Sequence, residues 1–125
     1  MAKTLIWRLK RAIDFEEDFK VIIVLPMLPG FPGDIKEADG SLLRKQVYWH
    51  LKTLVTDQNS LIRSIKDYLR VKNSKKSWKD FVRIFGLRNH CYHGERTQTE
   101  MIYVHSKCMI IDEDWLLVGS ANIND

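Results

Sequence analysis

The fold class of this 125-residue chain is decided by the stretch Val21-Ile-Ile-Val-Leu-Pro-Met-Leu-Pro-Gly-Phe-Pro-Gly33. Its first five residues are apolar and mostly β-branched, and they end at a proline, which predicts a strand buried on both faces of a sheet. The prolines and glycines that follow cannot continue regular structure and predict a shaped loop. This loop is either a plain connector or, at the carboxyl edge of a buried strand, part of a ligand site.

Helical and strand patterns alternate outward from this stretch. Helices are expected over the first 18 residues, from Ser41 to about Leu54, and from a capping Ser60 to Leu69. Further strands are expected at residues 81–85, 101–104, 108–111 and 116–118, with a loop at 86–90. The alternation predicts an α/β fold with helix–sheet–helix layers, formed by one domain over residues 1–125.

Composition narrows the function classes. A hydrophobic content of 45% argues against disorder, and the net charge of +4 favours an anionic partner, either nucleic acid or an acidic membrane surface. The absence of a secretory signal and of a long apolar run predicts a soluble or peripheral protein. Cys91 and Cys108 lie in no metal-binding pattern, so free thiols in a reducing compartment are favoured over one disulfide.

The residues that carry chemistry lie near the C-terminal end, where the chain has the pattern His105-x-Lys107, four residues, Asp112, six residues and Gly-Ser120-x-Asn122. Histidine can attack phosphorus or transfer a proton near neutral pH. The lysine, with the amide and hydroxyl donors of Asn122 and Ser120, suits the stabilisation of charge on phosphate oxygens. The pattern therefore predicts chemistry at a phosphodiester.

The spacing of this pattern is that of one β-hairpin. His105 and Lys107 are two residues apart and share a face of a strand, whereas Asp112 follows His105 by an odd offset. A three-residue turn pairing Ile111 with Trp115 would place Gly119 opposite Lys107 and Ala121 opposite His105. Asp112 is therefore expected to hold the turn. The hairpin supplies one imidazole and no obvious orienting carboxylate, so something else must complete the site.

The remaining histidines, His50, His90 and His93, are expected to be structural or at the surface, since no second ligand cluster supports a metal site. A basic stretch surrounds residues 73–77. It is either a solvated face or a contact with anionic lipid headgroups. Its members are Arg63, Lys66, Arg70, Lys72, Lys75, Lys76 and Lys79.

Taken with their surroundings, these residues resemble the phospholipase D superfamily, specifically the second catalytic half of eukaryotic phospholipase D. The proline loop resembles the family's strand and loop in that half, and the likeness extends over residues 19–125. The segments Phe85-Gly-Leu-Arg-Asn-His90, Thr99-Glu-Met-Ile-Tyr-Val-His-Ser-Lys107 and Gly119-Ser-Ala-Asn-Ile-Asn-Asp125 carry it best. It is weaker over residues 36–79.

The resemblance implies metal-free hydrolysis of phosphatidylcholine to phosphatidic acid, or transfer to an alcohol, at a site shared by two motif copies. One histidine forms a phosphohistidine, and His105 would more naturally be the acid–base residue. The resemblance also implies a cytoplasmic, peripheral membrane enzyme responsive to phosphoinositides, and favours lipid over nucleic acid.

The chain has one motif copy, so it is expected to be a half-domain incomplete at both ends and inactive alone. It would need the upstream motif half of the same full-length protein. The alternatives are a single-motif nuclease that completes its site as a homodimer, and a non-catalytic fragment.

Overall fold

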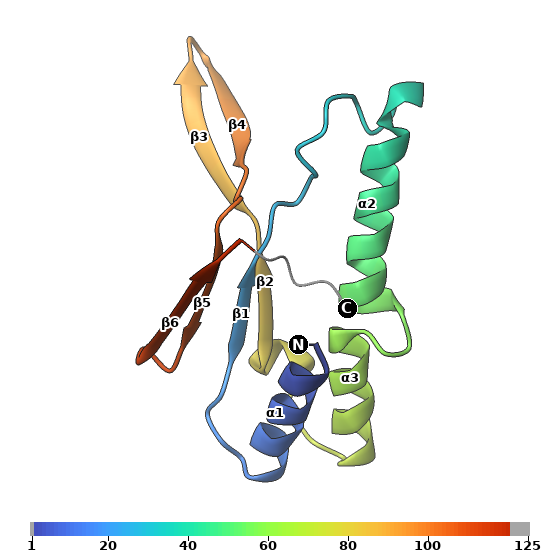
Figure 1. Ribbon diagram of the computed structural model, residues 1–125, viewed down its shortest axis with the longest axis vertical. Coiled ribbons are helices and arrows are strands. Elements are labelled where there is room, and N and C mark those ends of the chain that lie inside the picture. The colour runs from blue at the N-terminus through green and yellow to red at the C-terminus, as the bar shows by residue number, and fades with distance from the viewer. Residues whose placement is uncertain (1, 121–125) are drawn as a thin grey trace.

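The computed structural model describes residues 2–120 and shows a mixed α/β chain (Figure 1). The helices are α1 (Ala2–Asp14), α2 (Ser41–Leu51) and α3 (Leu61–Val71), with a π-helical turn η2 (Lys52–Thr56) and the 3-10 turns η1 (Ala38–Gly40) and η3 (Trp78–Asp80). The strands are β1 (Val21–Val24), β2 (Val82–Phe85), β3 (Leu87–His93), β4 (Arg96–Ile102), β5 (Lys107–Ile111) and β6 (Trp115–Gly119). Every expected helix is present.

Helix α3 begins after Ser60, as predicted, and Ser60 has the extended backbone of an N-cap (φ −64°, ψ 153°). Its side chain does not cap the helix, however. Oγ of Ser60 is buried and has no hydrogen-bond partner among residues 2–120. At the other end Asn73 has a φ of 48°, and the N–H of Ser74 donates to the carbonyl of Leu69 at 3.0 Å, which closes the last turn.

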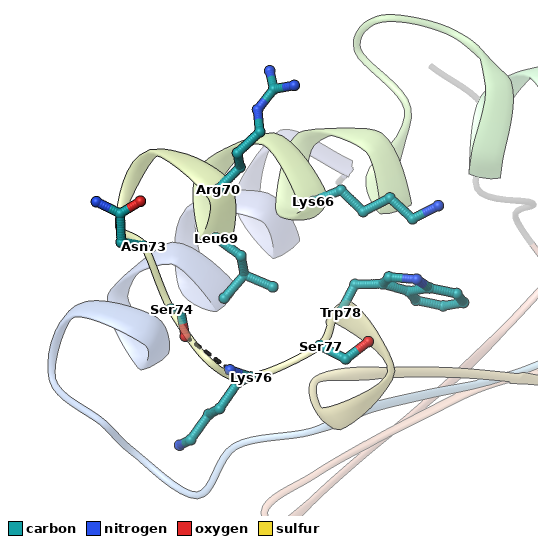
Figure 2. A pocket seen from close by; sticks show the side chains of 8 residues that line it. All are labelled: Lys66, Leu69, Arg70, Asn73, Ser74, Lys76, Ser77 and Trp78. Atoms are coloured by element: carbon teal, nitrogen blue, oxygen red, sulfur yellow. Dashed lines mark hydrogen bonds between the residues drawn. The ribbon is translucent and has the colours of Figure 1, made fainter.

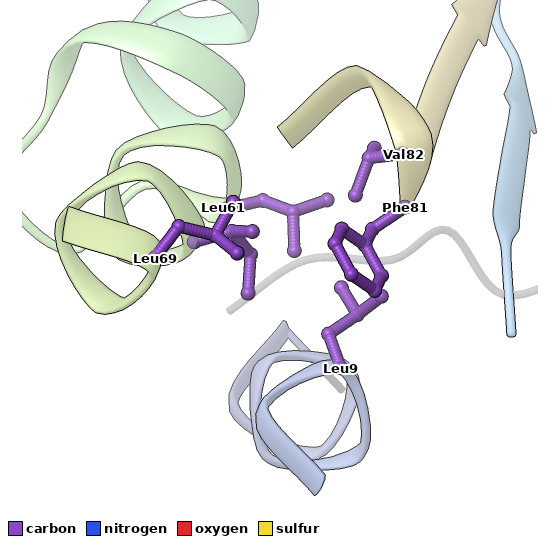
Figure 3. Close-up of a cluster of buried hydrophobic side chains, with 6 residues drawn as sticks. Leu9, Leu61, Leu69, Phe81 and Val82 are labelled. Atoms are coloured by element: carbon purple, nitrogen blue, oxygen red, sulfur yellow. The ribbon is translucent and has the colours of Figure 1, made fainter. Parts of the chain in front are cut away.

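The core forms where α1 and α3 pack on the β1–β2 pair. These strands are parallel, with Val21 paired to Val82, although α2 and α3 lie between them in the sequence. Figure 3 shows side chains from α1, α3 and β2 meeting in this core. Complete burial of such a side chain contributes about 1.5–3 kcal/mol. The buried cluster comprises Leu9, Leu61, Ile65, Leu69, Phe81 and Val82.

Only one face of the β1–β2 pair is covered within residues 2–120. Val21 and Ile23 pack against the core, whereas the alternate residues Ile22 and Val24 are 66% and 42% exposed. The expectation of a strand buried on both faces is therefore wrong for this part of the chain, because β1 has helices on one side only. The structure supports a mixed α/β fold, with one helical layer on this pair.

Helices α1 and α3 are also joined by a polar contact at the edge of the core. The hydroxyl of Tyr68 donates to the carboxylate of Asp14, and Nζ of Lys72 lies 2.7 Å from the same carboxylate. The hydrogen bond from Lys72, followed by that from Tyr68, lowers the pKa of Asp14. The hydrogen bond to Asp14 raises the pKa of Tyr68 and of Lys72 in turn. All three groups are therefore held in their ordinary neutral-pH charge states.

The second half of the chain is built from two antiparallel hairpins, β3–β4 and β5–β6 (Figure 1). The β3–β4 hairpin extends away from the helices and turns at Gly94, whose φ of 63° suits a tight turn. The expected loop at 86–90 is wrong, since most of it lies in β3, and the strand expected at 101–104 belongs to β4, which ends at Ile102. Pairing between largely polar residues forms this hairpin, and apolar runs do not reveal it.

Candidate functional site

The β5–β6 hairpin has the register that the motif spacing predicts. Ile111 pairs with Trp115, and Lys107 pairs with Gly119. The strand that carries the lysine is thereby brought beside the strand that leads to Ser120, which directly follows β6. Ala121 and Asn122, the remaining expected partners on this arm, lie outside the described residues.

Asp112 lies in the turn of this hairpin. Asp112 and Glu113 have φ values of 51° and 64°, and the N–H of Asp114 donates to the carbonyl of Ile111 at 3.1 Å. Aspartate tolerates this left-handed conformation better than most residues, because its short polar side chain can bond locally. Strand β5, extended at about 3.3 Å per residue, separates the turn from His105. This position agrees with the expected turn role for Asp112, and whether it also acts in catalysis stays a prediction.

At the other end of β5, His105 and Lys107 are brought together. Nζ of Lys107 lies 3.2 Å from Nε2 of His105 and donates to the backbone carbonyl of His105 at 2.7 Å. The two side chains are thus in contact, but His105 precedes β5, so the prediction that both lie on one face of a strand stays a prediction. An imidazole beside a lysine could act on a phosphate group in two ways, the imidazole in bond making or proton transfer and the lysine in binding the phosphate oxygens.

The site is exposed to solvent, and one ring nitrogen of His105 has no hydrogen-bond partner in the described part of the chain. His105 is exposed, and its Nδ1 has no hydrogen-bond partner among residues 2–120. By contrast, Nδ1 of His90 is hydrogen-bonded to Oγ1 of Thr99 at 2.8 Å. This pair lies on the β3–β4 hairpin, a different sheet from the one that His105 precedes. Within the same described part, no group of three or more His, Cys, Asp or Glu residues is placed to hold a metal ion. Both cysteines are free and exposed.

The proline loop lies against the segment that leads to His105. The backbone N–H of Leu28 donates to Sδ of Met101 at 3.3 Å, and a Cβ added at Gly30 would lie 3.1 Å from the ring of Tyr103. The ring of Tyr103 in turn stacks on the imidazole of His105. Motif reasoning identifies neither Gly30 nor Tyr103. The available signal was the placement of an aromatic residue two positions before the histidine.

A separate open hollow of about 470 Å³ lies beside the end of α3 (Figure 2). Lys66 extends along the ring of Trp78, with Nζ 5.4 Å from the ring centroid, and Leu69 points toward the loop. Arg70 is paired with Asp67 at 3.3 Å, whereas Lys66 and Lys76 form no ion pair among residues 2–120. The hollow thus has an apolar floor and basic edges. It is lined by Lys66, Leu69, Arg70, Asn73, Ser74, Lys76, Ser77 and Trp78.

The contact between His105 and Lys107 at the base of the hairpin joins two residues of the motif, and comparison with known proteins identifies the family of the chain. The family model described as Phospholipase D matches residues 1–125. The chain belongs to the phospholipase D family. Among its relatives, human Phospholipase D1 is 35% identical over 118 residues, which cover 94% of this chain and 10% of the human protein.

Two further relatives, from a plant and from Phytophthora, are also named phospholipase D and have a similar identity to this chain. Phospholipase D zeta 1 of Arabidopsis thaliana is 35% identical over 94% of this chain, and Phospholipase D of Phytophthora infestans is 36% identical over 98%. The chain spans about a tenth or less of the length of these curated relatives. It is thus a phospholipase D family segment that carries one copy of the motif. No helix described for residues 2–120 is long and apolar enough to cross a bilayer.

Proposed function

We propose that this chain supplies one half of a phospholipase D active site, which converts phosphatidylcholine to phosphatidic acid or transfers the phosphatidyl group to an alcohol. The observation that carries the proposal is the 3.2 Å contact between Lys107 and His105 at the base of the β5–β6 hairpin. It places an imidazole, which can transfer a proton, beside an amino group that can bind phosphate oxygens, as a phosphodiester reaction needs.

The chemistry requires two imidazoles. One attacks phosphorus while the bond from phosphorus to the choline oxygen breaks, and the other donates its proton to that oxygen. Water or an alcohol then passes a proton back to the second imidazole and attacks the phosphohistidine, which releases the first. We assign the second role to His105. Lys107, together with Ser120 and Asn122, would bind the phosphate oxygens as negative charge grows on them.

The first imidazole would come from the upstream motif half of the same full-length protein. Large apolar surfaces support this assignment, because exposed apolar patches mark interfaces. Ile22 and Val24 face outward on β1, and the three consecutive residues Leu116, Leu117 and Val118 leave both faces of β6 uncovered. An isolated two-stranded hairpin is marginally stable, so β5–β6 would gain its rigidity from that contact.

The basic hollow beside α3 would orient this half at a cytoplasmic membrane surface. Lys66 and Lys76 form no ion pair within residues 2–120 and lie over the rings of Trp78 and Phe81. Leu69 and Trp78 provide apolar contact, and tryptophan is favoured where one end of a side chain is wet. Each basic residue near an anionic leaflet contributes about 1 kcal/mol. Phosphoinositides, as highly charged headgroups, are the natural activators for such a surface. No cofactor is required for the reaction itself.

The deciding experiment measures primary-alcohol-dependent phosphatidyl transfer by the natural protein that carries this chain. We expect transfer by the wild type, its loss in His105→Ala, and its retention in the matched control His90→Ala, whose histidine lies on the β3–β4 hairpin. Residues 1–125 alone should form no stoichiometric phosphoenzyme. Metal-free DNA cleavage by a homodimer of the 125-residue chain, without phosphatidyl transfer, would overturn the proposal.

A further inference from the structure

The ring of Tyr103 lies against Gly30 of the proline loop on one side and is stacked beside His105 on the other, with 47% of the residue exposed. A Cβ added at Gly30 would lie 3.1 Å from Cε2 and Cζ of the Tyr103 ring. The ring therefore packs so close to Gly30 that a larger residue there would require the ring to move. On its other side the ring stacks on the imidazole of His105, with centroids 6.2 Å apart and planes 22° apart. Offset stacking at this separation is within the favourable range for aromatic pairs.

The contact matters because, within residues 2–120, Lys107 is the only other side chain that approaches the imidazole. His105 precedes β5, so no strand pairing fixes its backbone, and its Nδ1 has no partner among residues 2–120. Lys107 approaches Nε2, but its four-carbon side chain is flexible. A ring stacked on the imidazole limits rotation about its side-chain bonds without occupying either nitrogen.

The proline loop also contacts the segment that carries Tyr103. The backbone N–H of Leu28 donates to Sδ of Met101, two residues before Tyr103, and Pro29 is buried beside Gly30. The loop follows β1, which belongs to the packed core. A continuous path of contacts therefore runs from the core through the loop and Tyr103 to His105.

We propose that Tyr103 is a positioning residue. Its ring packs against the proline loop and holds the imidazole of His105 in the orientation needed for proton transfer. The ring does this through its face, and the hydroxyl is dispensable. The proposal rests on the proposed phosphodiesterase function for its kinetic consequence, but not for the stacked geometry, which can be measured separately. It also assigns the proline loop a function beyond connecting two elements.

The kinetic test compares Tyr103→Phe and Tyr103→Leu in the natural protein, assayed for phosphatidyl transfer. A misplaced catalytic group costs up to about 100-fold in rate, so we expect the leucine variant to lose about 10- to 100-fold in kcat with KM changed less than about 3-fold. The phenylalanine variant should stay within about 3-fold of the wild type. Tyr92→Leu is the matched control, because Tyr92 is 85% exposed on the β3–β4 hairpin.

A spectroscopic arm reports the stack whether or not the protein is active. With histidines isotopically labelled and His105 assigned by its loss in His105→Gln, the ring-proton resonances of His105 should be displaced by the Tyr103 ring current. The displacement should persist in Tyr103→Phe, disappear in Tyr103→Leu, and shrink in Gly30→Ala. Thermal unfolding of each variant separates these effects from loss of the fold.

The possible outcomes are distinct. Wild-type kcat in Tyr103→Leu, an equal loss in both Tyr103 variants, or unchanged His105 resonances in the leucine variant would each overturn the positioning role. An inactive wild type that still shows the displaced His105 resonances would overturn the proposed function while supporting the stack. A slow leucine variant with a normal phenylalanine variant supports the proposal.

Discussion

The hydroxyl of Tyr68 on α3 lies 2.7 Å from one carboxylate oxygen of Asp14 on α1 and 2.9 Å from the other. Nζ of Lys72 approaches the same carboxylate, so one acidic residue joins two helices through two donors. The ring of Tyr68 also lies near Nζ of Lys10, which is 5.0 Å from its centroid. This contact couples helix packing to pH.

We expect the packing of α1 on α3 to weaken in acid. The pKa of Asp14 is lowered, first by Lys72 and then by Tyr68, so its stabilising effect is complete above the ordinary carboxyl pKa of about 3.9 and is lost as the pH falls through the lower folded-state pKa. Urea unfolding at pH 7 and at pH 2–4 should show a smaller acid loss in Asp14→Asn than in the wild type. The control is Asp114→Asn, because the side chain of Asp114 has no hydrogen bond or ion pair among residues 2–120. This variant should lose as much stability in acid as the wild type does.

The alkaline side has the opposite sign. The pKa values of Lys72 and Tyr68 are raised, so the stability that these two residues contribute is complete below their ordinary pKa values. It is lost as the pH rises through their pKa values in the folded state.

If Asp14→Asn loses as much stability in acid as the wild type does, the contact of Asp14 with Tyr68 and Lys72 contributes nothing to stability.

Truncation of Leu9 should destabilise the core strongly. Leu9 is 0% exposed, and Leu→Ala at such a site costs about 2–5 kcal/mol through lost burial and the cavity left behind. The same substitution at Leu42, which is 58% exposed on α2, should change the free energy of unfolding by less than about 0.5 kcal/mol. Chemical denaturation measures both, and equal losses would contradict the assigned core.

Substitutions of Asp112 separate its turn role from a catalytic one. The φ of 51° is easily adopted by glycine, whereas a β-branched residue is strained there, so Asp112→Val should cost about 1–2 kcal/mol and Asp112→Gly should leave the fold intact. In the natural protein, Asp112→Gly should also keep most of the phosphatidyl-transfer activity. A loss of about 100-fold in Asp112→Gly with an unchanged melting temperature would instead establish a direct role in the chemistry.

Neutralising the hollow beside α3 should weaken binding to anionic membranes. At about 1 kcal/mol for each charge, replacing Lys66, Arg70 and Lys76 together by alanine should lower the affinity for phosphatidylserine-containing vesicles by about 100-fold at low salt. The charge-matched triple variant of Lys3, Lys36 and Lys45, residues outside the hollow, is the control. Vesicle sedimentation measures both, and equal losses would indicate a diffuse charge effect without a defined surface.

The sequence by itself determined the family, through motifs spread over residues 19–125, and the β5–β6 hairpin, through relations between neighbouring residues. The alternation of side chains in a strand, the turn at Asp112 and the pairing of Ile111 with Trp115 are local relations that spacing alone expresses. The helix starting after Ser60 is local in the same way, although the expected capping bond is absent from the described structure.

Only the tertiary structure decided what lies beside these elements. The pairing of Val21 with Val82, the open face at Ile22 and the seat of Tyr103 on Gly30 join residues that are far apart in the sequence. The polar β3–β4 hairpin was likewise hidden, since its strands lack apolar alternation. Long-range contacts form through packing and chain topology, and a local pattern carries no record of which distant segment will cover it.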